Sequence, residues 1–158
     1  MKDYLNAISL LPDRYKSVLE SISENIGVKV KEIRFRNGEP ITLNTQNDIY
    51  YIRKNGVLTV AFSSDLIVTD EKDLQEIVFH LSRRSLHTYQ DMIAKGFIPL
   101  RGGCKAGVVG RAVMKNGSVY SVSSFNSIAY LFSLKLTLQL GLLLEIFLLL
   151  MEKHVDIL

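Results

Sequence analysis

The feature of this sequence that most constrains its fold is a set of three Asn-Gly pairs, each set between two runs of strand-forming residues. The pairs are Asn37-Gly38, Asn55-Gly56 and Asn116-Gly117. Asparagine and glycine tolerate the positive φ angles of a tight turn, so each pair predicts a hairpin of two antiparallel strands. The flanking runs are KEIRFR and ITL, IYYIR and VLTVAF, and VVGRAVM and SVYSVS. Three hairpins in one chain predict a mainly antiparallel sheet.

Hydrophobic residues at helical spacing predict helices between these hairpins. The first set lies between Pro12 and Gly27, the second follows Thr69 as a candidate N-cap, and the third ends at Gly96. These sets are Tyr15, Val18, Leu19, Ile22 and Ile26; Leu74, Ile77, Val78 and Leu81; and Leu86, Tyr89 and Ile93. The resulting order predicts an α+β fold, with helices packed on one side of a mainly antiparallel sheet.

The composition changes sharply after Asn126, which predicts two parts. Residues 1–126 mix charged, turn-forming and periodic hydrophobic residues, as one α+β domain of ordinary size does. Residues 127–158 form a leucine-rich tail, expected to be a C-terminal helix or disordered. The single cysteine, Cys104, excludes an internal disulfide, and the N-terminus lacks a signal-peptide pattern, so we expect a cytoplasmic protein.

The segment FIPLRGGCKAGVVGRAV, residues 97–113, contains four of the chain's ten glycines. Gly102 and Gly107 have the glycine spacing of a phosphate-binding loop, but Val108 and Val109 stand where its lysine and hydroxyl residue are needed. Gly107 and Gly110 give only a GxxG. Isolated glycines next to strands more often mark a turn, a bulge or a close approach of backbones, and this structural interpretation is favoured.

No residues form a convincing catalytic or metal-binding pattern. His80, His87 and His154 are scattered, and Ser85 and Asp91 share one predicted helix with His87, an arrangement that rarely forms a triad. Cys104 is interpreted as a small residue that fits among glycines. The sequence therefore predicts a protein that is not an enzyme and that has no catalytic residues, no metal ligands and no cofactor of its own.

Several motifs, in order, resemble the N-terminal region of the stage III sporulation protein AA family. They are LLPDRYKSVLESI, VKEIRFRNGEPITL, VTDEKDLQEIV, SRRSLHTYQDMIAKGFIPLRGGCKAGVVGRAV and SVSSFN. The resemblance identifies Glu32, Arg34, Arg36 and Gly38 with the family's EIR-x-R-x-G motif. It identifies Gly96, Gly102, Gly103, Gly107 and Gly110 with the family's glycine-rich hairpin. Cys104, Lys105 and Ala106 replace a His-Arg-Val run, and Arg101, Lys105 and Arg111 are candidate interaction residues.

The resemblance implies a non-catalytic assembly or interaction domain of a secretion-type sporulation ATPase. In the full-length family protein, an ATPase domain that uses ATP and magnesium is expected to follow, to form homo-oligomers and to serve the channel between mother cell and forespore. Other channel proteins are the implied partners. No GxxxxGK[ST] occurs in this chain, so we expect a truncated form without ATPase activity.

The leucine-rich tail leaves three interpretations open. Residues 128–151 are long and apolar enough for a membrane helix, although Lys135 and Glu145 lie inside this window, which allows a membrane-anchored or peripheral interaction protein. A buried amphipathic helix fits poorly because the run is apolar almost all round. The tail also fits the family's gene read in a shifted frame, since codons for Leu142 to Glu152 can encode a T-T-x-R-D-I-x-x-x-[N/D]-G pattern that resembles the helix after the P-loop lysine.

The basic residues support an alternative function as a small nucleic-acid-binding module. The net charge is +3, and Arg34 and Arg36 share one face of a predicted strand. Arg83, Arg84, Arg101, Lys105 and Arg111 could extend a positive surface. Few aromatic residues interleave with these charges, so nucleic acid is the less favoured partner.

Overall fold

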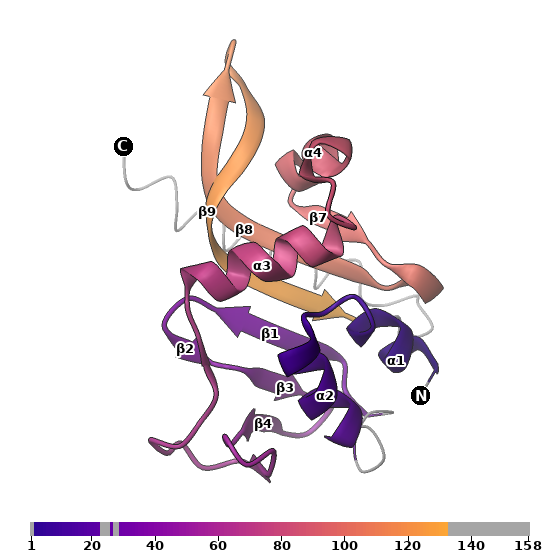
Figure 1. Ribbon diagram of the computed structural model, residues 1–158, viewed down its shortest axis with the longest axis vertical. Coiled ribbons are helices and arrows are strands. Elements are labelled where there is room, and N and C mark those ends of the chain that lie inside the picture. Colours follow the sequence, from indigo (N-terminus) through magenta and orange to yellow (C-terminus); the bar gives the residue numbers. More distant parts are fainter. Residues whose placement is uncertain (1, 23–25, 27–28, 133–158) are drawn as a thin grey trace.

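The computed structural model describes residues 2–22, 26 and 29–132, which form an α+β fold (Figure 1). Seven described strands form a sheet in the order β5-β4-β3-β1-β9-β8-β7, and all of its pairs are antiparallel. Strands β2 and β6 form a separate antiparallel pair. The elements are α1 (Lys2–Ile8), α2 (Asp13–Ile22), β1 (Glu32–Arg36), β2 (Glu39–Pro40), β3 (Thr42–Asn44), β4 (Ile49–Ile52), β5 (Leu58–Thr59), β6 (Val68–Thr69), α3 (Glu71–Leu81), α4 (Leu86–Ala94), β7 (Phe97–Pro99), the 3-10 turn η2 (Arg101–Gly103), β8 (Lys105–Lys115) and β9 (Ser118–Leu131).

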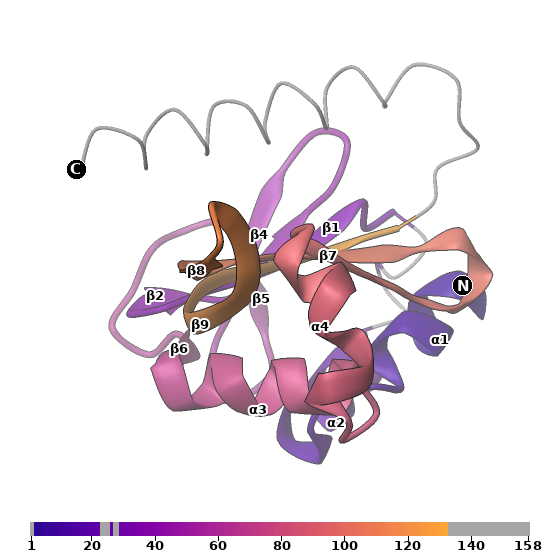
Figure 2. The ribbon, with the colours of Figure 1, turned by 90° about the horizontal axis from the view of Figure 1, so that it is seen from above.

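The helices lie on one side of the sheet, as the sequence predicts (Figure 2). Alternate residues of the strands point toward them and form the core, because side chains of a strand alternate between its two faces. The buried apolar residues of this sheet are Ile33, Phe35, Leu43, Ile52, Ile98, Ala106, Val108, Phe125, Ile128 and Tyr130. They pack with buried residues of α1, α2 and α3, such as Ile8, Leu19, Leu74 and Ile77.

The three Asn-Gly pairs form three different turns. At Asn116-Gly117 both residues have positive φ, 52° and 77°, as a two-residue type I′ hairpin requires. At Asn55-Gly56 only the glycine has positive φ, and the hairpin closes through the hydrogen bond from Arg53 N to Val57 O of 2.9 Å. At Asn37-Gly38 the flanking strands β1 and β3 pair antiparallel as predicted, in the register Arg34–Thr42. The expected tight turn is wrong, because β2 lies between the two strands.

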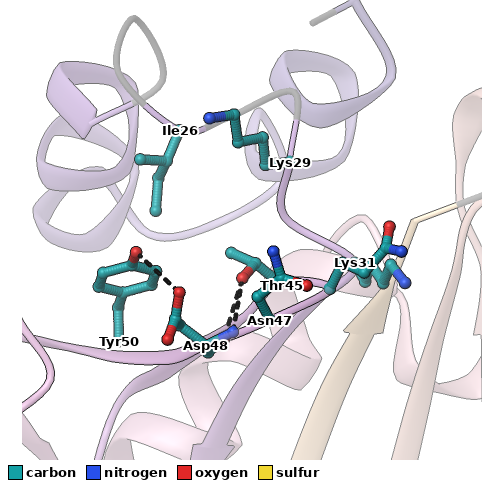
Figure 3. A pocket seen from close by; sticks show the side chains of 8 residues that line it. Ile26, Lys29, Lys31, Thr45, Asn47, Asp48 and Tyr50 are labelled. Carbon is teal, nitrogen blue, oxygen red and sulfur yellow. Dashed lines mark hydrogen bonds between the residues drawn. The ribbon is translucent and has the colours of Figure 1, made fainter.

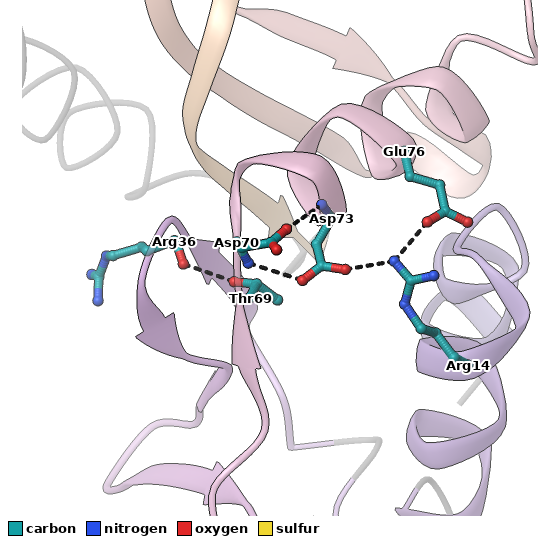
Figure 4. A network of polar contacts seen from close by, with 6 residues as sticks. All are labelled: Arg14, Arg36, Thr69, Asp70, Asp73 and Glu76. Carbon is teal, nitrogen blue, oxygen red and sulfur yellow. Dashed lines mark hydrogen bonds and ion pairs between the residues drawn. The ribbon is translucent and has the colours of Figure 1, made fainter.

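Helix α3 begins one residue later than expected, with Asp70 rather than Thr69 as its N-cap (Figure 4). The Asp70 carboxylate accepts from Asp73 N, and the Asp73 carboxylate accepts from Asp70 N, each at 2.9 Å. This reciprocal pair satisfies two backbone donors. The buried Thr69 hydroxyl instead donates to Arg36 O at 2.7 Å, which ties the end of β1 to the start of α3.

The ordered sheet continues past the predicted boundary at Asn126. Strand β9 extends to Leu131, and its residues Ile128 and Tyr130 are fully buried in the core. The first residues of the candidate membrane segment at 128–151 are therefore part of the sheet, since a strand that pairs with both β1 and β8 satisfies their backbone groups. The rest of that segment, and the remainder of the leucine-rich tail, lie outside the described residues.

The β8–β9 hairpin is long and coiled. Its register shifts leave Asn126, Ser124 and Tyr120 of β9 without partners in β8. Extra residues of this kind bend a hairpin and increase its twist. All three lie in β9, so the alternation of side chains along β8 is unbroken.

Candidate functional site: the open face of the sheet

The family-motif residues of β1 lie on the face of the sheet that points away from the helices. Because Ile33 and Phe35 point into the core, Glu32, Arg34 and Arg36 occupy the opposite face. We call this surface the open face and define it by the β1 residues together with their same-face neighbours in register on β3, β9, β8 and β7. These are Glu32, Arg34, Arg36, Thr42, Asn44, Phe97, Pro99, Lys105, Gly107, Val109, Ser127, Ala129 and Leu131.

The register places Arg34 in line with the glycine-rich segment. Arg34 pairs with Ala129 of β9, Ala129 pairs with Gly107 of β8, and Gly107 pairs with Phe97 of β7. A Cβ added at Gly107 would meet its nearest atom, Ala129 O, at 3.9 Å, so the backbone does not demand glycine here. Two small residues, Ala129 and Gly107, therefore lie next to each other on the open face between Arg34 and Phe97, and we call this row of small residues the lane.

The arginines of the motif are paired with carboxylates. Arg34 Nε forms an ion pair with Glu32 Oε1, and both side chains are largely buried. Arg36 Nη1 forms a more exposed ion pair with Glu39 Oε2 at 3.2 Å. The open face is therefore close to neutral around β1. This pairing weakens the electrostatic case for nucleic-acid binding by these two arginines, because each already has an anion beside it.

The β8 side of the open face is basic. Lys105 is exposed, and its Nζ lies 5.3 Å from the centre of the Phe97 ring, within range of a cation–π contact. No aspartate or glutamate occurs between Asp91 and the end of the described residues at 132. The basic residues in that stretch are Lys95, Arg101, Lys105, Arg111 and Lys115.

Four glycines of the family motifs lie away from the open face, at positions where the backbone has a positive φ angle. Gly38, Gly96, Gly102 and Gly103 have φ angles of 75°, 88°, 75° and 80°, which other residues rarely adopt. Gly96 directly follows α4 and its C-cap residue, Lys95. A Cβ at Gly102 would also meet the Asp3 carboxylate of α1 at 2.8 Å.

Gly110 permits a close approach of β8 to β9. A Cβ at this position would lie 2.8 Å from Ser123 O and 3.1 Å from Phe125 Cα, and both are backbone atoms that cannot move away easily. The glycine therefore allows the bend at which the hairpin leaves the sheet. The two candidate interaction arginines lie apart, since Arg101 is exposed in η2 and Arg111 follows the bend.

Sequence reasoning missed several open-face residues, including Asn44, Phe97 and Ala129. Asn44 Oδ1 is buried and has no hydrogen-bond partner in the part of the chain that the structure describes. A signal was available for Ala129, because the segment SIAYLF alternates. Ile128 and Tyr130 point to one face of the strand, so Ala129 between them points to the other. The pairing between strands that are distant in the sequence could not be predicted from such a local pattern.

Other features lie outside this face. Cys104 is buried, and residues 2–22, 26 and 29–132 contain no group of three potential metal ligands. None of the helices within that range is long and apolar enough to cross a membrane. A polar pocket of about 450 Å³ beside β4 contains none of the predicted site residues (Figure 3). It is lined by Ile26, Lys29, Lys31, Thr45, Gln46, Asn47, Asp48 and Tyr50.

These features define a small α+β domain whose sheet is covered by helices on one face and carries paired charges and small residues on the other. A sequence model of the family described as Sporulation stage III, protein AA matches residues 2–138. The chain belongs to this family, and the match extends past the expected boundary at Asn126.

A curated relative is the stage III sporulation protein AA of Bacillus subtilis (strain 168). It is 28% identical over 120 residues, which cover 74% of this chain and 35% of the relative. The chain thus spans about a third of the length of the relative that it matches. No solved structure matches the chain.

Proposed function

We propose that this chain supplies a non-catalytic assembly and interaction domain in endospore formation. The observation that carries the proposal is that family-motif residues from two distant segments, Arg34 and Gly107, lie in line on either side of Ala129, on a sheet face that no described helix covers. Membership of the sporulation family supports the process, and the short share of the relative that is matched supports a domain role. In the full-length family protein, a separate ATPase portion would bind ATP and magnesium.

The open face suits contact with other protein surfaces better than chemistry. Its lane of small residues allows close approach, while the Glu32–Arg34 ion pair is held beside it in a partly desolvated setting. A paired charge at the margin of an apolar contact favours a defined orientation of the partner. The implied contacts are with neighbouring subunits or with other proteins of the channel between mother cell and forespore, on its cytoplasmic side.

The test is a replacement in the Bacillus subtilis relative. Residues 2–132 of this chain would replace the matched stretch, and a second strain would lack that stretch. Spore titre and the ATPase rate of the purified proteins would be measured for both. We expect the deletion to abolish spores while retaining ATP hydrolysis, and the replacement to restore spores at least partly.

Two results would contradict this proposal. Normal spore titres without the domain would exclude a required assembly role. Loss of ATP hydrolysis in a deleted protein that still folds and binds nucleotide would show that the domain takes part in catalysis.

A further inference from the structure

The β8–β9 hairpin projects from the body of the domain (Figure 1). Strand pairing of β9 with β1 ends at Ser127, and one further backbone bond runs from Asn37 N to Asn126 O at 3.0 Å. Beyond that point β8 and β9 pair only with each other, and Gln90 Nε2 of α4 donates to Tyr120 O at 3.1 Å. We call residues 110–125 the distal ribbon. All residues from Arg111 to Tyr120 are exposed. A two-stranded ribbon is marginally stable by itself, so its exposure calls for a role outside the domain core.

One edge of β8 is open along the distal ribbon. Strand β7 pairs with β8 only from Lys105 to Gly107, and the last backbone bond on that side is from Val108 N to Gly96 O at 2.8 Å. From Val109 to Lys115, no backbone group bonds to any described segment other than β9. Such an edge presents free N–H and C=O groups to which another strand can pair.

One row of side chains along this strand combines basic and apolar residues, which alternate toward the tip as Arg111, Val113 and Lys115. Because the extra residues of the hairpin all lie in β9, alternate residues of β8 share one side along its whole length. That row is Lys105, Gly107, Val109, Arg111, Val113 and Lys115. Val113 and Met114 are 40% and 58% exposed. The row joins the open face to the tip of the ribbon.

We propose that the open edge of β8 accepts an extended, acidic segment of another protein as an added strand. Carboxylates of that segment would lie opposite Arg111 and Lys115, and an apolar side chain would cover Val113. The added strand would supply main-chain hydrogen bonds for affinity, and the alternating side chains would give specificity. This inference rests on the proposed function and specifies the chemistry of one partner.

The charges of the ribbon argue against two other occupants. A second copy of this chain paired through the same edge would bring Arg111 and Lys115 against like charges, which destabilises cross-strand pairs. Single-stranded nucleic acid would need aromatic stacking platforms. Tyr120 is the one aromatic residue of the ribbon before Phe125. Lys115 Nζ already lies 4.8 Å from the centre of the Tyr120 ring.

The experiment measures binding of synthetic peptides to the full chain by fluorescence anisotropy. The probe is a labelled strand-forming peptide of threonine and valine with two glutamates four residues apart, which matches the spacing of Arg111 and Lys115. A control peptide has glutamine at both positions. Two further peptides carry N-methyl groups on alternate residues. In the first peptide the methyl groups remove the N–H donors along one edge of the strand, and in the second they remove those along the other edge.

The protein variants have matched charge changes. We expect Arg111→Glu combined with Lys115→Glu to weaken binding by about tenfold or more, as the loss of complementary charges at a contact does. Lys54→Glu combined with Lys72→Glu changes the net charge equally at exposed positions outside the ribbon, and should leave the affinity within about twofold. N-methylation of one edge should abolish binding, whereas N-methylation of the other should not.

Three outcomes would overturn the inference. Equal binding of both N-methylated peptides would show attraction without strand addition. Tighter binding of single-stranded DNA, lost in the ribbon variant, would assign the row to nucleic acid, and a dimer lost in that variant would assign it to a second copy. None of these binding results depends on the spore titres of the replacement strain. The proposed function and this inference are therefore tested by separate measurements.

Discussion

At the scale of single residues, two buried tyrosines differ in how their hydroxyls are satisfied. Tyr4 donates to Leu19 O in the last turn of α2 at 3.0 Å, whereas the fully buried Tyr130 hydroxyl has no hydrogen-bond partner in the described part of the chain. A buried hydroxyl without a partner lowers stability, because it loses its bonds to water and gains none. The two residues therefore form a natural pair for comparison.

We predict that Tyr130→Phe leaves the free energy of unfolding unchanged or raises it by about 1 kcal/mol, while Tyr4→Phe lowers it by about 1 kcal/mol. Urea denaturation of both variants checks this. Burial also raises the pKa of Tyr130 well above its ordinary value. The free energy of unfolding is therefore unaffected by Tyr130 ionisation below about pH 10, and it falls as the pH rises further. Tyr130→Phe should reduce this fall in the free energy of unfolding at alkaline pH. A large destabilisation by Tyr130→Phe would contradict this account.

A second residue-level prediction concerns Asp73, whose carboxylate accepts from the N-cap residue Asp70 N and pairs with Arg14 Nη2 at 2.6 Å (Figure 4). Burial alone would raise the pKa of Asp73, but the Asp70 backbone N–H, Tyr15 and Arg14 together hold that pKa below its usual value. Its stabilising effect is therefore present above about pH 4 and lost as the pH falls through the lowered pKa.

We expect Asp73→Asn to lower the free energy of unfolding by about 1 kcal/mol at neutral pH, and the deficit to shrink in acid. Urea denaturation at pH values on both sides of that range measures it. Glu71→Gln is the matched control, because Glu71 lies in the same first turn but outside the capping pair, and its effect should be smaller. A deficit that stays constant with pH would exclude the ionised carboxylate as its source.

At the scale of elements, β8 contains two glycines whose surroundings differ in the space that they leave for a side chain. Gly110 faces backbone atoms of β9 at 2.8 and 3.1 Å, whereas Gly107 has open space up to 3.9 Å. We predict that Gly110→Ala lowers the free energy of unfolding by about 1–3 kcal/mol, as overpacking does, and that Gly107→Ala changes it by less than about 0.5 kcal/mol. Urea denaturation measures both, and equal effects would show that the bend does not depend on Gly110.

Local patterns predicted the elements of this fold, and pairing between distant strands decided the rest. The Asn116-Gly117 hairpin and the helix before Gly96 were correctly predicted, because their signals lie within a few residues. Helix α1 was missed, although Tyr4, Ala7, Ile8 and Leu11 have helical spacing and are buried. The alignment of Arg34 with Gly107 across Ala129 depends on both strands pairing with β9, which no local signal encodes.

At the scale of the whole molecule, the domain separates stability from the proposed contact. The core and the capping network lie on the helical side, whereas the family-motif charges lie on the open face. A substitution on the open face should therefore affect partners without unfolding the domain. Ala129 is a suitable position, because it lies between Arg34 and Gly107 and is only partly buried.

We predict that Ala129→Leu fills the lane on the open face and reduces spore titre in the replacement strain by about tenfold or more, since a misfitting side chain at an interface centre costs several kcal/mol of contact. The melting temperature should change by less than about 5 °C, which corresponds to about 1 kcal/mol for a domain of this size. Ala61→Leu, at an exposed position outside the open face and the distal ribbon, is the control and should leave the titre unchanged. If Ala129→Leu instead lowers the melting temperature strongly, the open face contributes to the fold itself; if neither property changes, the lane is not a contact surface.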